Sequence, residues 1–234
     1  AVFVLLAPRL AVLILSWLLA GLFFALVLFR MVLLGAGLLS ALKPRTAAKP
    51  GATIRDAELP VYSVLVPLYR EAECAPQLVR ALAQLNYPRR KLDIKLVLEA
   101  DDLTTFAAVR KIHLPPQFEV LLTPPLAPRT KPKACNYALG FARGEYVVIY
   151  DAEDIPAPDQ LRLAAAAFAA GGGQLACLQA RLNYYNSREN WLTRQFTLEY
   201  SMWFDWLLPG LQALGLPIPL GGTSNHFRVP VLRA

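Results

Sequence analysis

Six acidic residues stand out because they follow two stretches of sequence that are predicted to be buried strands. They are Glu99, Asp101, Asp102, Asp151, Glu153 and Asp154. In open α/β sheets, ligands bind beyond the carboxyl ends of the strands, where loops and helix N-termini converge. Acidic residues at such ends can also cap helices, and Asp159 is predicted to do so. Two clusters on parallel strand ends favour a binding site, since like charges held close together cost free energy unless a cation or hydrogen-bond donors lie between them.

The chemistry expected of these clusters is the binding of a hard divalent cation. Mg²⁺ and Mn²⁺ keep several waters, take one or two carboxylates, and complete their coordination with phosphate oxygens of a substrate. The sequence therefore predicts Mg²⁺ or Mn²⁺ as the cofactor and a ligand that carries a diphosphate.

The elements that must position these residues alternate between strands and helices. Short apolar runs predict strands at 61–67, 94–98, 118–122, 145–150 and 174–182. Helical spacing predicts helices at 75–85, 103–111, 133–142, 158–170 and 190–207. This βαβα series indicates an α/β fold with a mostly parallel sheet. The aromatic-rich helix at 190–207 suits either the core or a membrane interface.

A long apolar segment precedes the series. From Leu10 to Leu39 only Ser16 and Arg30 interrupt the apolar residues, and the run is long enough to cross a hydrocarbon layer of about 30 Å. We predict one transmembrane helix here. A break at Arg30, between a spanning helix and a shorter interfacial one, is the alternative.

Three regions follow from these features: a transmembrane segment over 1–42, a juxtamembrane linker over 43–60, and an α/β domain over 61–234. One basic residue, Arg9, precedes the helix, whereas several basic residues follow it. These are Lys43, Arg45, Lys49 and Arg55. The bias predicts that the domain lies on the cytoplasmic side of the membrane.

The net charge of +7 is compatible with several anionic partners. The basic residues do not form one strip with interleaved aromatics, so we expect no binding of nucleic acid. Lipid headgroups and an anionic ligand account for the charge. The three cysteines are scattered without a CxxC spacing, which argues against a disulfide framework or a zinc site.

Five segments carry a resemblance to a known family through their order and spacing. They are VPLYRE (66–71), EADD (99–102), KPKACNYAL (131–139), DAED (151–154) and GGTSNHFR (221–228). Together they resemble family 2 glycosyltransferases of the membrane-bound, cellulose-synthase-like kind. The resemblance implies a GT-A fold, which is a Rossmann-like, mostly parallel sheet with flanking helices, over 61–234.

The resemblance also implies a nucleotide-sugar site. Its residues are Pro67, Tyr69, Glu71, Asp101, Asp102, Lys133, Asn136 and Asp151. By this resemblance, Tyr69 and Glu71 lie near the base, and either Asp101 or Asp102 contacts uracil or ribose. Lys133 matches the lysine of the family's H-x-K-x-G-N segment and is expected near the diphosphate.

The metal and acceptor sites follow from the same resemblance. Asp151 matches the first acid of the family's DxD metal motif and Glu153 takes the place of the second, with Asp154 as a competing ligand. The implied acceptor residues are Gly222, Thr223, Ser224, Asn225 and His226. An ordinary polar turn, with His226 incidental, is the alternative.

The implied function is that of a membrane-bound inverting glycosyltransferase, a hexosyltransferase of EC class 2.4, in polysaccharide biosynthesis. Its donor is expected to be a UDP-sugar and its acceptor a growing glycan. The alternatives are a polyprenol-phosphate sugar transferase and a non-catalytic, nucleotide-sugar-binding scaffold of a secretion complex. Membrane lipid and other subunits of such a complex are expected partners.

We expect the chain to be a piece of a longer, multi-pass protein of the inner (cytoplasmic) membrane. The family's T-E-D segment, which contains the general base, and its Q-x-x-R-W motif do not occur in the sequence. The general base is therefore expected beyond Ala234, and this chain alone is predicted to be inactive.

Overall fold

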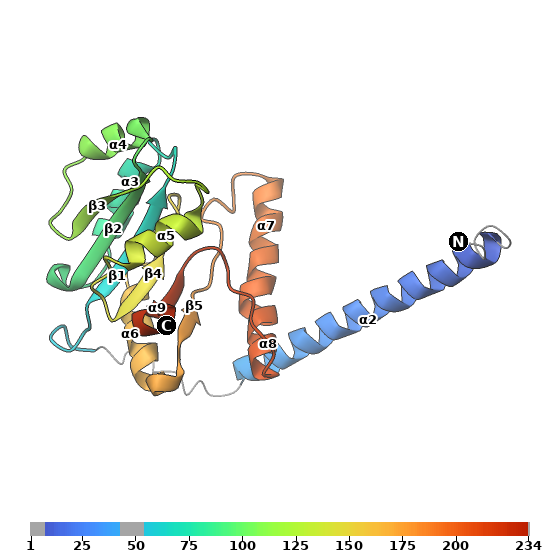
Figure 1. Cartoon of the computed structure of the whole chain (residues 1–234). Helices are drawn as coiled ribbons and strands as arrows, with labels where there is room; N and C mark the ends of the chain where they lie inside the picture. Colours follow the sequence, from blue (N-terminus) through green and yellow to red (C-terminus); the bar gives the residue numbers. More distant parts are fainter. Residues whose placement is uncertain (1–7, 43–53, 234) are drawn as a thin grey trace. The chain divides into compact units, whose positions relative to one another are not determined.

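The computed structural model describes residues 8–42 and 54–233, which divide into two compact units (Figure 1). One unit contains helix α2 (Pro8–Leu42) and residues 181–219, and the other contains 54–180 and 220–233. Residues 43–53 of the predicted linker lie outside the described residues. The predicted domain at 61–234 thus includes a segment that the structure groups with the N-terminal helix.

The second unit is built on a six-stranded sheet with the order β3-β2-β1-β4-β6-β5. The strands are β1 (Tyr62–Leu68), β2 (Leu92–Glu99), β3 (Phe118–Thr123), β4 (Tyr146–Ile149), β5 (Cys177–Gln179) and β6 (Asn225–Arg228). The first four are mutually parallel, and β6 runs antiparallel to both β4 and β5. The predicted α/β class with a mostly parallel sheet is confirmed.

Helices cover both faces of this sheet, as Figure 1 shows. One face is covered by α3 (Ala75–Ala83), α4 (Leu103–Arg110) and α6 (Gln160–Gly171), and the other by α5 (Lys131–Leu139) and α9 (Val229–Arg233). The short 3-10 helices η1 (Arg89–Lys91) and η2 (Gly172–Gln174) lead into β2 and β5.

The central strands are buried on both sides. In β1, Val64 and Val66 pack in the core beneath α3 and α6, while Leu65 packs in the core beneath α5. Because both faces are covered, these strands have near-continuous apolar sequences rather than an alternating pattern.

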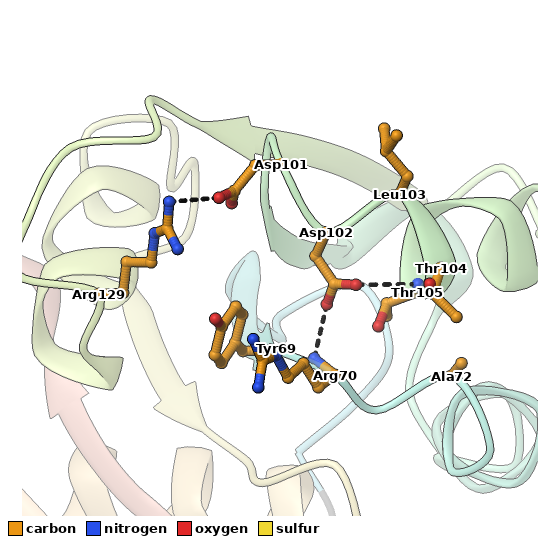
Figure 2. A pocket seen from close by; sticks show the side chains of 9 residues that line it. All are labelled: Tyr69, Arg70, Ala72, Asp101, Asp102, Leu103, Thr104, Thr105 and Arg129. Carbon is orange, nitrogen blue, oxygen red and sulfur yellow. Dashed lines mark hydrogen bonds and ion pairs between the residues drawn. The ribbon is translucent and has the colours of Figure 1, made fainter.

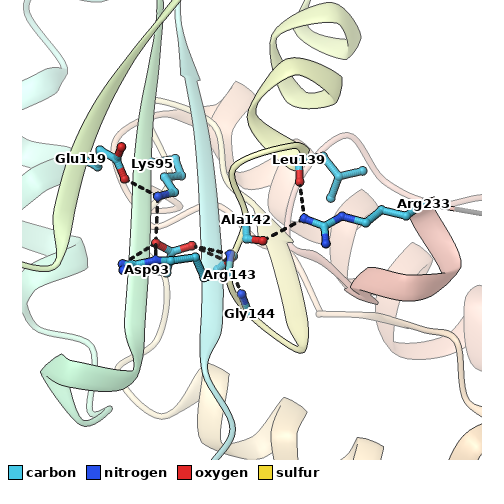
Figure 3. Close-up of polar contacts among 9 residues, drawn as sticks. Asp93, Lys95, Glu119, Leu139, Ala142, Arg143, Gly144 and Arg233 are labelled. Atoms are coloured by element: carbon cyan, nitrogen blue, oxygen red, sulfur yellow. Dashed lines mark hydrogen bonds and ion pairs between the residues drawn. The ribbon is translucent and has the colours of Figure 1, made fainter.

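The face beneath α5 also buries a charged pair near the amino ends of β1 and β2 (Figure 3). Lys95 Nζ lies 2.9 Å from Asp93 Oδ1 and also pairs with Glu119. Arg143 donates to Asp93 from its Nε at 2.9 Å and its backbone nitrogen at 3.0 Å, and Ser63 Oγ donates at 2.7 Å. Burial raises the pKa of Asp93. The hydrogen bonds from these donors lower it by a larger amount, so the net pKa is below its ordinary value.

In the first unit, α2 runs without a break through Arg30. Its 35 residues give a length of about 52 Å, which exceeds a hydrocarbon layer of about 30 Å. It is the one helix among the described residues that is long and apolar enough to cross a membrane.

The same unit contains α7 (Trp191–Met202), a π turn η3 (Trp203–Leu207) and α8 (Leu208–Ala213). Asn190 begins α7 with a reciprocal capping box, since its side chain accepts from the Thr193 backbone nitrogen at 3.0 Å. The predicted helix at 190–207 is therefore two differently wound segments.

The C-terminal part of α2 packs closely on η3 and α8. A Cβ atom at Gly37 would overlap the carbonyl oxygen of Trp206, and a Cβ atom at Gly210 would overlap that of Leu33. Small residues that allow such close backbone approach are typical of helix packing in membranes.

Candidate functional site

A cavity of about 400 Å³ lies at the carboxyl ends of β1 and β2 (Figure 2). Its lining includes Tyr69, Arg70, Asp101, Asp102, Thr105 and Arg129. The carboxyl end of β1 enters the turn at Tyr69 and Arg70, and β2 leads into the first acidic cluster. The cavity is therefore at the edge of the sheet where ligands of open α/β folds bind.

Asp102 shapes this cavity through its hydrogen bonds to the backbone. One carboxylate oxygen accepts from the Arg70 nitrogen at 2.5 Å, and the other accepts from the Thr105 nitrogen at 3.2 Å, as the N-cap of α4. Arg70 has φ of 60°, in the left-handed region, and the bond to Asp102 holds it there. Burial raises the pKa of Asp102. The hydrogen bonds lower it by a larger amount, so the net pKa is below its ordinary value.

Asp101 instead reaches across the cavity. Its side chain is 39% exposed and pairs with Arg129. Tyr69 is also accessible, with the guanidinium of Arg70 5.2 Å from its ring centroid. An aromatic face and an accessible carboxylate suit a flat, hydrogen-bonding ligand such as a nucleobase.

The second acidic cluster lies at the end of β4. Asp151 pairs with the ammonium of Lys131, which also donates to the carbonyl oxygen of Gly222. The Lys131 and Asp151 side chains are 35% and 32% exposed, and Glu153 is exposed. The Lys131 ammonium therefore balances the charge of Asp151.

Asp154 has a different environment from Asp151. Its Oδ2 accepts from the Asp151 backbone nitrogen at 2.7 Å and from the Thr223 hydroxyl. Burial raises the pKa of Asp154, and although these bonds lower it, the net pKa is above its ordinary value. Asp154 thus joins the end of β4 to the segment before β6.

The donor set at β4 fits Mg²⁺ or Mn²⁺. Among the residues that the structure describes, no three acidic, histidine or cysteine side chains gather closely enough to hold a metal by themselves. Asp151, Glu153 and the Gly222 carbonyl are oxygen donors, and these ions use few carboxylates because phosphates and waters complete the shell.

Lys133 is directed elsewhere. Its ammonium lies 2.7 Å from Glu99 and donates to the carbonyl oxygens of Pro124 at 3.2 Å and Leu126 at 2.9 Å. These contacts anchor the loop after β3. On the same helix, burial raises the pKa of Cys135 to about 11, which favours its thiol form.

The remaining predicted donor residues are spread along this edge. Pro67 is half-buried in β1, Glu71 is half-buried in the turn after it, and Asn136 is exposed on α5. The Glu71 backbone nitrogen donates to Thr105 Oγ1 at 3.1 Å.

The predicted acceptor residues differ in exposure along the chain. Gly222 is exposed and Thr223 is half-buried, whereas Ser224 and Asn225 are buried. Ser224 has φ of 55° where the chain turns into β6.

His226 is part of the core, with 1% of its surface exposed. Its Nδ1 is 2.7 Å from the Tyr62 hydroxyl and its Nε2 is 3.4 Å from Gln160 Nε2. Burial lowers its pKa to about 4, so the ring is neutral at pH 7.

Three residues of this edge were not predicted: Arg129, Lys131 and Gln179. Gln179 accepts from the Gly221 nitrogen at 2.6 Å and donates to the Thr223 carbonyl at 3.3 Å, so it shapes the segment before β6. Lys131 and Lys133 are two residues apart, and the sequence alone does not show which one faces Asp151.

The cavity and the β4 cluster adjoin. Arg129 lines the cavity and Lys131 pairs with Asp151, and residues two apart in the chain are at most about 7 Å apart. The segment from Arg129 to Lys131 therefore links the cavity to the β4 cluster along the same edge of the sheet.

The comparison with known families agrees with this architecture. Residues 63–229 match the family described as Glycosyl transferase family 2, and the chain belongs to this family. The predicted family 2 membership is confirmed.

Similar proteins support the same assignment. Probable glycosyltransferase YdaM of Bacillus subtilis (strain 168) is 31% identical over 101 residues, which are 42% of this chain and 24% of YdaM. The mannosyltransferase PcManGT from Pyrobaculum calidifontis, solved in complex with GDP-Man and Mn²⁺, superposes with a TM-score of 0.59 at 24% identity, over 90% of this chain and 56% of that one. TarS of S. aureus (residues 1–349) has a TM-score of 0.50 at 19% identity, over 74% and 48%. These likenesses confirm the predicted GT-A fold.

Proposed function

We propose that this chain carries the donor site of a membrane-bound inverting glycosyltransferase. The observation that carries the proposal is the cavity lined by Tyr69 and Asp101, with Asp151 at the end of β4 on the same carboxyl edge of the sheet. A nucleoside diphosphate has a flat base at one end and anionic phosphates at the other, so it matches both parts of this site.

The residues take distinct roles in this proposal. The base lies against Tyr69 and contacts Asp101, while Asp102 holds the turn that shapes the cavity. Asp151 and Glu153 would hold Mg²⁺ or Mn²⁺, which when bound neutralises the leaving diphosphate. The mannosyltransferase neighbour solved with GDP-Man and Mn²⁺ supports a donor and a metal of this class.

The acceptor is proposed to be a growing polysaccharide near Gly222 and Thr223, which are the accessible residues of the predicted acceptor segment. The proposed acceptor site leaves out His226 because its ring is enclosed by the sheet. The general base is assigned to a segment outside this chain, so we expect donor binding with little or no transfer.

Calorimetric titration of the full chain in detergent tests the proposal. UDP should bind with Mn²⁺ present and much more weakly without it, and Asp151→Asn should abolish the difference. Asp159→Asn removes the same charge near Asn86, away from the site, and should bind like wild type. Binding of GDP in place of UDP would change only the proposed donor. If neither nucleotide binds with Mn²⁺ present, the proposal fails and the scaffold alternative is favoured.

We further propose that α2 anchors the chain in the inner membrane, in a multi-pass protein, with the sheet domain in the cytoplasm. The exposed apolar surface of α2 and the basic residues after it support this orientation. Alkaline phosphatase fused after residue 234 should be inactive, because this reporter needs export. Activity of that fusion would place the domain on the opposite side.

A further inference from the structure

The first turn of α5 places a lysine ammonium against the end of β4. Lys131 Nζ donates to Asp151 Oδ1 and to the Gly222 carbonyl oxygen, which belongs to the segment before β6. The ammonium is therefore held by oxygens from two separate elements. A carboxylate and a carbonyl oxygen are also the donors that a hard divalent cation prefers.

The Lys131–Asp151 pair is accessible enough to open without unfolding the domain. Both side chains are about one-third exposed, and ion pairs at such positions contribute little to stability. Lys133 makes a useful contrast, because its side chain is 22% exposed and its ammonium contacts oxygens of three other residues. Of these two lysines, Lys131 is the one whose partner is a proposed metal ligand.

We propose that Lys131 is a displaceable counter-ion of Asp151. It neutralises the carboxylate while no metal is bound, and it transfers to the diphosphate of the nucleotide when a divalent cation takes its place. This inference rests on the proposed donor site and assigns to Lys131 the diphosphate contact that the sequence predicted for Lys133.

The chemistry of lysine suits this exchange. Its ammonium is a compact point charge on a flexible four-carbon stem, so it can change partners without backbone movement. A divalent cation satisfies Asp151 with a larger charge than the ammonium does. The diphosphate then offers the released ammonium a charge-assisted hydrogen bond, which is stronger than a neutral one.

The exchange makes metal and nucleotide binding cooperative. The metal alone must displace an ammonium that has no new anionic partner, whereas with nucleotide present the ammonium gains one. By linkage, the metal must strengthen nucleotide binding by the same factor as the nucleotide strengthens metal binding. This coupling is measurable without any transfer of sugar.

The test measures Mn²⁺ binding by the full chain in detergent from the electron paramagnetic resonance signal of unbound Mn²⁺, with and without UDP or GDP. In Lys131→Gln, Mn²⁺ alone should bind about threefold more tightly, because no ammonium competes. The gain in Mn²⁺ affinity on adding nucleotide should shrink about tenfold, because the diphosphate loses a cation. Lys131→Arg keeps the charge and should retain the coupling. Lys111→Gln, at an exposed lysine beyond α4, is the matched control and should bind like wild type.

The outcomes separate the two proposals. If wild type shows no Mn²⁺-dependent nucleotide binding, the proposed donor site fails whatever Lys131 does. If wild type shows the coupling and K131Q keeps it, with Mn²⁺ alone bound no more tightly, Lys131 is a structural contact and the inference is overturned. A K131Q variant that does not fold, judged by circular dichroism, has the same meaning.

Discussion

The carboxylate of Asp101 reaches toward Arg129 across the cavity, whereas that of the adjacent Asp102 accepts hydrogen bonds from the backbone at Arg70 and Thr105 (Figure 2). The turn after β2 points the two adjacent side chains in different directions. The sequence could place both at the ligand-binding edge, but only the structure distinguishes an accessible carboxylate from one that holds the wall of the cavity.

Alanine at position 101 should therefore mainly weaken nucleotide binding, whereas alanine at position 102 should mainly lower stability. Asp101→Ala should weaken nucleotide binding about tenfold and change stability by less than about 1 kcal/mol, because its ion pair is exposed. Asp102→Ala should lower the free energy of unfolding by about 1–2 kcal/mol, because it removes an N-cap and a partner of Arg70. Calorimetry and denaturant titration measure the two effects. Wild-type stability of D102A would contradict the structural role of Asp102.

His226 makes the stability of the domain depend on pH. Its folded pKa of about 4 is below the ordinary value of about 6.5, so its contribution is fully present above pH 6.5 and is lost as the pH falls through 4. Between these limits the loss amounts to about 3 kcal/mol. In His226→Gln this part of the pH dependence should vanish, as measured by denaturant titrations of both proteins from pH 7 to pH 4. Parallel pH profiles for the two proteins would show that the ring is not held neutral.

At the scale of elements, the buried charged pair beneath α5 is expected to affect stability and not ligand binding, because it lies away from the carboxyl ends of the strands. Asp93 and Lys95 are both about 1% exposed (Figure 3). Asp93→Ala should lower the free energy of unfolding by about 3 kcal/mol, because it leaves a buried ammonium with less compensation. Asp56→Ala, which removes an exposed partner of Arg162, is the control and should change it by less than about 1 kcal/mol.

A double substitution adds a second check on the same pair. Asp93→Leu with Lys95→Met removes both charges, and it should restore much of the stability, because well-packed apolar side chains replace buried ion pairs at little cost. If denaturant titration shows the double variant to be weaker than D93A, packing rather than charge explains the loss.

The sequence predicted elements well where burial on both faces leaves a strong pattern, as in the apolar run at 61–67 that became β1 (Tyr62–Leu68). It could not show that β6 lies antiparallel between β4 and β5, because the four residues of β6 owe their pairing to distant partners. It also could not show that Lys131 pairs with Asp151 and Lys133 with Glu99, since these contacts depend on how α5 is rotated against the sheet. The motifs thus predicted which segments lie at this edge of the sheet, and the packing of α5 decides which of its side chains face Asp151.

At the scale of the whole molecule, the N-terminal helix, which is long and apolar enough to cross a membrane, also packs against η3 and α8. Gly37 of α2 touches the backbone at Trp206, whereas Gly35, two positions earlier, has no atom within 4 Å that an added Cβ would meet. Gly37→Ala should therefore destabilise the first unit by about 1–3 kcal/mol, through overpacking.

The neighbouring glycine supplies the matched control. Gly35→Ala should be neutral or stabilising by up to about 1 kcal/mol, because alanine favours helix. Thermal unfolding in detergent, followed by tryptophan fluorescence, reports on this unit because all four tryptophans lie in α2, α7 and η3. Equal effects of the two substitutions would contradict the close approach of α2 and η3.

The length of the π turn at Trp203–Leu207 determines which face of α8 points in the same direction as a given face of α7. Each residue of an α-helix advances the chain by about 100° around the axis, so deleting one residue from this turn would rotate α8 by about that angle relative to α7. Gly210 would then no longer face the backbone of Leu33 in α2, and a bulkier side chain would take its place. A relative that is one residue shorter in this turn must carry its small residue at a different position to keep the same close contact with α2. The length of the turn and the position of the glycine are therefore expected to change together.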